Sequence, residues 1–514
     1  MSRTLLRIGA TIAAGAAALA VTPPVLAGPT GCNRANSTHA KLAECVTLAG
    51  VREHQAAFQA IADANGGTRA AGTPGYDASV DYVVDRLEKA GYAVTLDEFP
   101  FTYVPAATLR QTAPVTATYA TGGFTGTGYG TVSAAVTAVD INLVLPRANT
   151  SGCEAADFAG FPSGNIALIQ RGTCTFAVKA LNAQAAGASA VVVFNQGNDP
   201  TREGLIIGTL APSTATIPVV GASFAAGAAL SQPGSQAYID VPQPQQITQV
   251  NVIAESRWGN PDNVVMAGAH LDSVQAGPGV NDNGSGSAAI LEVAENLAKV
   301  ETYNKVRFAW WGAEEAGLVG STQYVAGLSQ AERDKIALYL NFDMVGSPNH
   351  VFFVYDGDDS DGVGAGPGPV GSARIEETFE AFYDQRGIPF KGTDFTGRSD
   401  YGPFIAVDIP SGGLFTGAEG IKTAEEATLW GGTAGQQYDP CYHLACDTYA
   451  NNNNGALDVN SDAVAFGVLQ YAMNTSDVNG VPGKGNFPPA QAATATVGSV
   501  SLQGGLHVDE PPAV

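Results

Sequence analysis

Histidine and carboxylate side chains follow short apolar runs in the middle of this sequence. His270 and Asp272 come directly after the run Val264–Ala267, and Asp282 stands in a Gly- and Asn-rich loop just before a helical pattern. Imidazole and carboxylate together form a donor set that suits a divalent metal such as zinc. Further donors follow two later apolar runs and a cysteine-flanked loop: Glu314, Glu315, Asp343 and His443.

This set contains more donors than one metal ion needs. A tetrahedral zinc ion takes about four ligands, whereas the set offers two histidines and several carboxylates. The surplus favours two ions roughly 3.5–4 Å apart that share one bridging carboxylate. An isolated histidine is more often structural, and we interpret four others in that way: His39, His54, His350 and His507.

The apolar runs that would position these donors alternate with helical patterns. Strands are expected over Val306–Trp311 and Leu338–Phe342, and Gly284–Gly286 opens a helix with one apolar face. Strands separated by helices predict an α/β fold, a mostly parallel mixed sheet with helices on both faces. In such sheets, polar side chains at the carboxyl ends of the strands form the site.

The segment before the first metal motif has the same character. Helices are expected over Val51–Ala64 and Tyr76–Ala90, and a strand over Ala93–Phe101. We therefore assign residues 49–105 and 245–474 to one domain.

Residues 106–244 differ from this domain in composition. They are rich in Ala, Gly, Thr and Val, with strand-length runs and no cluster of His, Asp and Glu at ligand-like spacing. We expect a smaller β-rich module inserted into the host domain.

The N-terminus has the pattern of a secretory signal. Arg3 and Arg7 precede the apolar run Ile8–Val21, and small or apolar residues lead up to Ala27. The alternative, a membrane anchor, would need a run of about 20 residues. We expect a signal peptide over 1–27, an N-terminal arm or propeptide over 28–48, and a flexible tail over 475–514.

Cysteine usage and charge agree with export. Six cysteines favour disulfides between sequence neighbours, namely Cys32–Cys45, Cys153–Cys174 and Cys441–Cys446, although other connectivities remain open. A zinc ribbon is disfavoured because no pair has the C-x₂-C spacing. The net charge of −23 argues against nucleic acid as a partner.

Five motifs occur in the order HLDS, NDNGSG, WWGAEEAGLVGS, NFDMVG and DPCYHLACD. Together they resemble the co-catalytic di-zinc aminopeptidase family, which includes secreted bacterial leucyl aminopeptidases and aminopeptidase Y. The similarity covers residues 50–105 and 245–474 and implies a zinc-peptidase, phosphorylase/hydrolase-like fold. The insert, with GNIALIQRGTCTFAVKALNAQAAGASAVVVFN, resembles a protease-associated domain.

The resemblance implies a ligand set for two Zn²⁺ ions. Asp282 would bridge them, His270 and Asp343 would complete one site, and Glu315 and His443 the other.

The resemblance also implies roles around these ions. Glu314 would be the general base, Asp272 would accept the imidazole N–H of His270, and Tyr442 would stabilise the tetrahedral intermediate. Arg398 would bind the substrate backbone, or alternatively form a structural salt bridge. Phe415 would line an apolar pocket, or alternatively pack in the core.

Two further acidic stretches have different interpretations. Asp458 and Asp462 resemble a calcium site of some relatives, although the N-terminal ligands of that site are not recognisable here. The loop 356–362, DGDDSDG, lacks the glutamate that completes an EF-hand, and we interpret it as solvated.

The leading hypothesis is a secreted, monomeric zinc aminopeptidase that removes an apolar, leucine-like residue from peptide N-termini, with no membrane partner after signal cleavage. Carboxypeptidases of related architecture would need more arginines than Arg398, and glutaminyl cyclases use a single zinc. A non-catalytic binding protein that works through the inserted domain is the alternative from another class.

Overall fold

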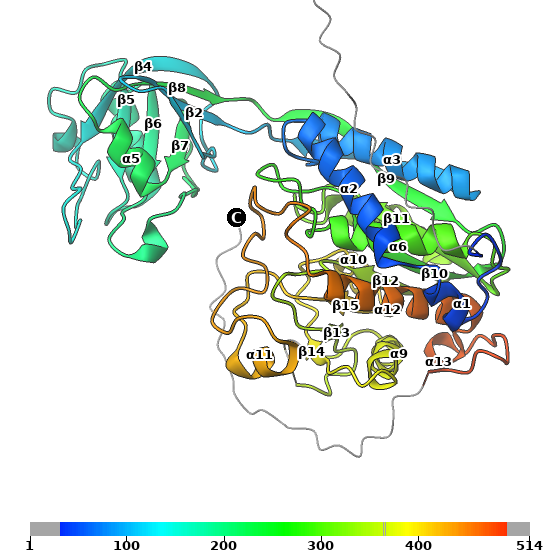
Figure 1. The fold of residues 1–514 in the computed structure, drawn as a ribbon. Coiled ribbons are helices and arrows are strands. Elements are labelled where there is room, and N and C mark those ends of the chain that lie inside the picture. The colour runs from blue at the N-terminus through cyan, green and yellow to red at the C-terminus, as the bar shows by residue number, and fades with distance from the viewer. Residues whose placement is uncertain (1–30, 363, 365, 491–514) are drawn as a thin grey trace, which may run out of the picture.

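The computed structural model describes residues 31–362, 364 and 366–490, and Figure 1 shows two lobes of unequal size. The signal peptide expected over 1–27 lies outside the described residues, as do residues 491–514 of the expected tail. Within the described ranges, no helix is long and apolar enough to cross a membrane.

The larger lobe is built on an eight-stranded mixed sheet. Its order is β1 (Ala93–Tyr103), β9 (Gln245–Glu255), β11 (Asn304–Trp311), β10 (Asn260–His270), β12 (Ile336–Phe342), β15 (Ser411–Phe415), β13 (Phe353–Tyr355) and β14 (Lys391–Thr393). The four central strands β11, β10, β12 and β15 run parallel, and the antiparallel pairs lie toward the edges. The predicted α/β fold is confirmed.

Helices cover both faces of this sheet. One core contains residues of α1 (His39–Ala43), α2 (Leu48–Ala64), α3 (Pro74–Ala90), α6 (Gly284–Leu297), α9 (Ser372–Asp384), α12 (Asn454–Met473) and α13 (Ser476–Asn479). A second core contains residues of α7 (Val319–Gly327) and α10 (Gly402–Ile405). Two short helices, α8 (Gln330–Arg333) and α11 (Ala424–Trp430), complete the set.

Strand β10 shows why both faces need helices. Val265 and Ala267 belong to the first core, whereas Val264 and Met266 belong to the second. Successive side chains of a strand point to opposite faces, so a continuous apolar run predicts a strand that is buried on both sides.

The smaller lobe has a seven-stranded sheet of its own. Its order is β3 (Ala117–Tyr119), β2 (Thr108–Ala113), β8 (Gln236–Val241), β4 (Gly130–Val139), β5 (Ile166–Gln170), β6 (Ala190–Phe194) and β7 (Val219–Ala222). The helices are α4 (Phe176–Ala185) and α5 (Phe224–Leu230), with the 3-10 turns η1 (Ala155–Phe158) and η2 (Pro200–Arg202). Two separate apolar cores lie against this sheet.

The smaller lobe enters and leaves the larger one at a single point. Strands β1 and β9 are antiparallel partners, with Tyr103 opposite Gln245 at the end from which the insert departs. Figure 1 shows the two connections running side by side from these strands to β2 and β8. The insertion therefore leaves the host sheet continuous.

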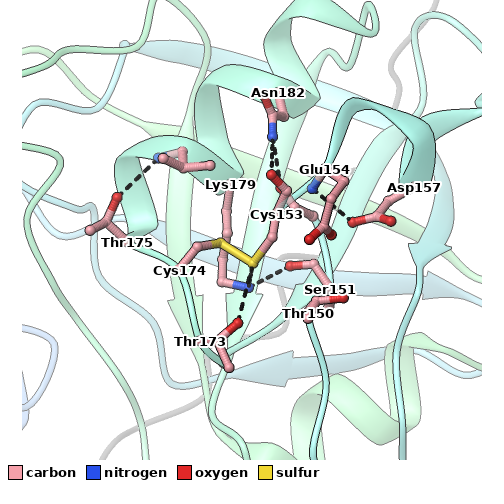
Figure 2. The surroundings of a disulfide bond; sticks show 12 residues. Thr150, Ser151, Cys153, Glu154, Asp157, Thr173, Cys174, Thr175, Lys179 and Asn182 are labelled. Carbon is pink, nitrogen blue, oxygen red and sulfur yellow. Dashed lines mark hydrogen bonds between the residues drawn. A yellow bond between two sulfur atoms is a disulfide. The ribbon is translucent and has the colours of Figure 1, made fainter.

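Three disulfides join cysteines that are neighbours in the sequence: Cys32–Cys45, Cys153–Cys174 and Cys441–Cys446. Figure 2 shows the one in the smaller lobe. Beside it, the buried Lys179 donates to the carbonyl of Ser151, and Asn182 Nδ2 donates to the carbonyl of Cys153 over 2.9 Å. These contacts anchor the crosslinked loop to α4.

The two segments that flank the larger lobe are more ordered than the sequence suggests. In the arm expected over 28–48, Leu42 and Val46 belong to the first core. The tail was expected from residue 475, but residues 475–490 fold onto the lobe. Val478 and Phe487 are buried there, and Asn474 Nδ2 donates to the carbonyl of Phe487 over 2.7 Å. Two apolar anchors within a Pro- and Gly-rich stretch account for this correction.

Candidate metal centre

The expected donors meet at the carboxyl edge of the central parallel strands. Each follows the end of a strand, precedes α6, or stands in the loop between α11 and α12. His270 ends β10, Asp282 precedes α6, Glu314 and Glu315 follow β11, Asp343 follows β12, and His443 lies in the loop.

Asp282 lies between the two histidines. Its Oδ1 is 3.3 Å from His270 Nε2, and its Oδ2 is 3.3 Å from His443 Nε2. His270 Nε2 is also 3.3 Å from Asp343 Oδ1, and His443 Nε2 is 2.9 Å from Glu315 Oε2. The five side chains thus form two groups that share one carboxylate.

Neighbouring charges and burial change the proton affinities of these groups. Burial opposes charge on His270, but the carboxylates of Asp343 and Glu314 raise its pKa well above the ordinary value. Burial raises the pKa of Glu314 well above its usual range, and burial with the charge of Asp282 raises that of Glu315 to about 8. The repulsion between carboxylates crowded in this way is relieved when a divalent cation binds among them.

Two oxygen atoms in the cluster have a further property of metal ligands. Glu315 Oε1 and Asp343 Oδ1 are buried and have no hydrogen-bond partner within the described part of the chain. A buried carboxylate oxygen without a partner is costly unless it is paired or binds a cation. The donor types and these atoms fit two zinc ions, each held by imidazole and carboxylate.

Asp272 differs in part from expectation. Its main-chain carbonyl is 3.1 Å from His270 Nδ1, whereas its nearest carboxylate oxygen is 3.7 Å from that nitrogen, too far for a hydrogen bond. The carboxylate instead accepts the main-chain N–H groups of Glu314 and Glu315, over 3.1 and 3.3 Å. The peptide oxygen therefore takes the imidazole contact, and the carboxylate fixes the loop that carries both glutamates.

A chain of buried hydrogen bonds, not visible in the sequence, orients Asp343. Tyr339 OH donates to Asn341 Oδ1 over 3.1 Å, Asn341 Nδ2 donates to Ser399 Oγ over 2.9 Å, and Ser399 Oγ donates to Asp343 Oδ2 over 2.6 Å. Trp311 Nε1 donates to Tyr339 OH over 2.8 Å. One oxygen of Asp343 is thereby fixed, and the other stays available.

Arg69 is a further residue that sequence reasoning missed. It is fully buried and donates to the carbonyls of Leu271, Pro278 and Gly279, in the loop between His270 and Asp282. Its segment, NGGTRAAGTPGY, belongs to the part of the chain that resembles the aminopeptidases, but a buried arginine leaves no periodic signal.

Asp447, which closes the DPCYHLACD motif, holds the other side of the same loop. Its carboxylate accepts the main-chain N–H groups of Asn281 and Asp282, each over 2.9 Å. Burial raises the pKa of Asp447 to about 7. This residue orients the peptide that presents the shared carboxylate.

A cavity of about 1030 Å³ opens onto the donors. Arg398 and Phe415 both line it. Arg398 donates to Glu419 over 2.8 Å and to Tyr442 OH over 3.2 Å. Arg398 therefore forms a salt bridge and also faces the cavity. Phe415 stacks on Phe353 with ring centroids 5.9 Å apart.

The remaining acidic candidates lie away from this centre. Asp458 and Asp462 are one turn apart on α12 and belong to none of the groups of three or more possible ligands among the described residues. Calcium binding there stays a prediction. The 356–362 loop is less solvated than expected, because Asp356 is buried and accepts the N–H of Ser360 over 3.0 Å.

Comparison with known proteins gives consistent matches. The model for peptidase family M28 matches residues 251–468, and the model for the PA domain matches residues 139–230. An aminopeptidase from Pseudomonas aeruginosa is 53% identical over 454 residues, which cover 86% of this chain and 84% of that protein. Leucine aminopeptidase 2 from Trichophyton rubrum is 47% identical over 336 residues, 64% of this chain and 66% of that protein.

A solved structure is similar over most of the chain. A zinc aminopeptidase from Bacillus subtilis is 25% identical with a TM-score of 0.60, and the alignment covers 82% of this chain and 94% of that one.

Proposed function

The chain belongs to peptidase family M28 and is a metallo-aminopeptidase, and on that premise we propose an exported di-zinc enzyme that removes apolar, leucine-like residues from peptide N-termini. One observation carries the proposal for two ions: Asp282 directs one oxygen toward each histidine. In this assignment, His270 and Asp343 hold one ion with Asp282, and Glu315 and His443 hold the other.

The protein's own residues divide the chemistry between them. When bound, the zinc pair would acidify a water molecule and polarise the scissile carbonyl. Glu314, which lines the cavity beside the ligands, accepts the proton of the attacking water and passes it to the leaving amine.

Tyr442 and Arg398 act at the carbonyl oxygen of the scissile peptide bond. The Tyr442 hydroxyl donates to the carbonyl oxygen as negative charge develops there. Arg398, held by Glu419, keeps that hydroxyl in place through its own hydrogen bond.

The proposed preference for apolar residues is supported by the cavity. Aromatic side chains of Phe353, Tyr355, Phe415 and Tyr438 line it beside the metal donors. A leucine-like side chain would be desolvated against these rings, which contributes roughly 1.5–3 kcal/mol for a fully buried side chain.

Export is supported by the N-terminal pattern and the disulfides. Arg3, Arg7 and the apolar run that follows match a secretory signal. Three disulfides and no free cysteine in the described residues suit an oxidising environment.

Two variants test the division of roles. Glu314→Gln should lower kcat by about 10²–10⁴-fold, the usual contribution of a general base, while the protein keeps both zinc ions. His443→Ala should lose one ion together with activity. Metal content by mass spectrometry and hydrolysis of a leucine anilide are measured on the same preparations. Near-normal turnover by Glu314→Gln, or two ions retained in His443→Ala, would refute the assignment.

A further inference from the structure

A second cluster of possible metal ligands lies far from the metal centre. It consists of His54 on α2 and Glu292 and Glu295 on α6, each offering one donor atom within 4.8 Å of the others. Helices α2 and α3 lie over α6 in Figure 1, and all three contribute to the same core. Glu292 is eight positions beyond Gly284, where α6 begins beside the metal centre, which corresponds to about 12 Å along the helix.

His54 presents an unpaired nitrogen to this cluster. The side chain is completely buried, and its Nε2 has no hydrogen-bond partner in the described residues. The nearest carboxylate oxygen, Glu292 Oε2, is 3.5 Å away. That separation is close to the roughly 3.3 Å expected between two ligand atoms of a tetrahedral zinc ion.

The other ring nitrogen of His54 is already engaged. Its Nδ1 is 2.8 Å from the hydroxyl of Tyr82 on α3. A metal-binding histidine usually donates its second N–H to an oxygen, which fixes the tautomer and the ring orientation. Tyr82 is therefore placed to direct a bare Nε2 at the carboxylates.

Gly50 makes room for the carboxylate of Glu292. A Cβ at this position would lie 2.2 Å from Glu292 Oε1, so only glycine admits the carboxylate in its present place. The packing holds Glu292 against α2, beside His54.

The local charge favours a divalent cation. Arg86 on α3 donates to both carboxylate oxygens of Glu295, over 2.7 Å to Oε2, and over 2.9 Å to Glu53. The carboxylates of Glu53, Glu292 and Glu295 and the one guanidinium of Arg86 all lie near Tyr82, so negative charge is in excess there and a divalent ion at His54 would balance it. Glu295 is about one-fifth exposed, which leaves a side from which an ion and a water molecule can enter.

From this geometry we propose a structural zinc site formed by His54, Glu292 and Glu295. Three protein ligands and one water complete a tetrahedron. The ion crosslinks α2 to α6 and stabilises the lobe without taking part in hydrolysis. The imidazole distinguishes this site from calcium or magnesium sites, whose ligands are oxygen atoms.

The test counts zinc in the full-length enzyme and two matched variants after equilibration in the same zinc-buffered solution. Glu295→Gln should carry one zinc ion fewer per chain than the unmodified protein and retain leucine anilide hydrolysis, which also shows that it is folded. Glu53→Gln removes a charge that pairs with Arg86 but is not a ligand, and it should keep the ion. A third variant, His54→Gln, should behave like Glu295→Gln.

The same measurements can overturn the proposal. Equal zinc content in Glu295→Gln and the unmodified protein would show that no ion depends on Glu295. Loss of an ion in Glu53→Gln as well would show that charge alone, not ligation, attracts zinc to this face. Loss of activity together with the ion would mean that the counted ion belongs to the catalytic centre. Because hydrolysis is recorded separately, failure here differs from failure of the proposed catalytic roles.

Discussion

At the residue scale, two of the proposed zinc ligands, Asp343 and Asp282, are oriented by partners that sequence spacing does not reveal. Asp343 is fixed through Ser399, and the loop between His270 and Asp282 is held from two sides by Arg69 and Asp447. Buried groups whose hydrogen bonds are all made resist reorganisation. Removal of a hydrogen-bond partner of a metal ligand typically lowers the metal affinity by roughly 10–100-fold.

Replacement of Ser399 should therefore weaken one of the two proposed zinc sites. Ser399→Ala removes the 2.6 Å hydrogen bond to Asp343 and leaves that carboxylate free to rotate. We expect the affinity for one zinc ion to fall by roughly 10–100-fold, as measured by competition with a chromophoric chelator.

Ser461→Ala is the matched control, because Ser461 is also buried and donates to the carbonyl of Leu457 within α12. Its zinc affinity should be unchanged. Equal affinities for the Ser399 variant and this control would show that the hydrogen bond does not tune the site.

At the scale of secondary-structure elements, the site depends on how closely α6 approaches β12. Gly286, in the first turn of α6, packs against the carbonyl of Phe342, the last residue of β12. Asn283 caps the helix by accepting the N–H of Gly286 over 2.9 Å and also donates to that same carbonyl. The helix start that carries Asp282 and the strand end that carries Asp343 are thus locked together.

A side chain at Gly286 should disrupt this contact. A Cβ there would lie 2.1 Å from the Phe342 oxygen, so Gly286→Ala forces the helix away from the strand. We expect the free energy of unfolding of the larger lobe to fall by about 1–3 kcal/mol, the usual cost of overpacking, with weaker zinc binding. Gly327→Ala at the end of α7 is the control, since nothing lies within 4 Å of its added Cβ. A thermal midpoint for Gly286→Ala equal to that of the control would contradict this account.

The hydrophobic periodicity of the sequence predicted which helices and strands form better than it predicted where they begin and end. The helix expected from Val51 begins at Leu48, where the Thr47 side chain accepts the N–H of Gly50. The apolar pattern alone does not mark that start, but the capping residue does. The order of residues 475–490 was missed because Val478 and Phe487 are single anchors without a periodic pattern.

The donor residues could be predicted because each follows a strand end, a local feature of the sequence. Their supports could not, because Arg69 and Asp447 meet the loop between His270 and Asp282 from segments about 200 and 165 positions away. Such contacts arise from tertiary packing, on which a single sequence places few constraints.

At the scale of the whole molecule, the chemistry and the inserted lobe are separate. All residues that line the cavity at the metal donors lie between His270 and His443, outside the smaller lobe. The insert begins and ends beside the paired residues Tyr103 and Gln245. The smaller lobe has its own sheet and cores, and it can be removed without cutting the host sheet.

An enzyme with a short turn joining Tyr103 to Gln245 should therefore keep its zinc. We expect it to hydrolyse a leucine anilide within roughly tenfold of the full chain, a barrier change below about 1.4 kcal/mol. Kinetics on the anilide and on longer peptides would be compared. Loss of anilide hydrolysis by a folded, zinc-loaded variant would show that the insert contributes directly to the site.

The most direct measurement is the release of a chromophore from leucine anilide and from N-acetyl-leucine anilide, before and after chelation and zinc restoration. A di-zinc aminopeptidase should cleave only the compound with a free amino group. It should lose that activity with the chelator and recover it as two zinc ions per chain return to the catalytic centre. Cleavage of the acetylated compound, or full activity after complete removal of zinc, would contradict the account.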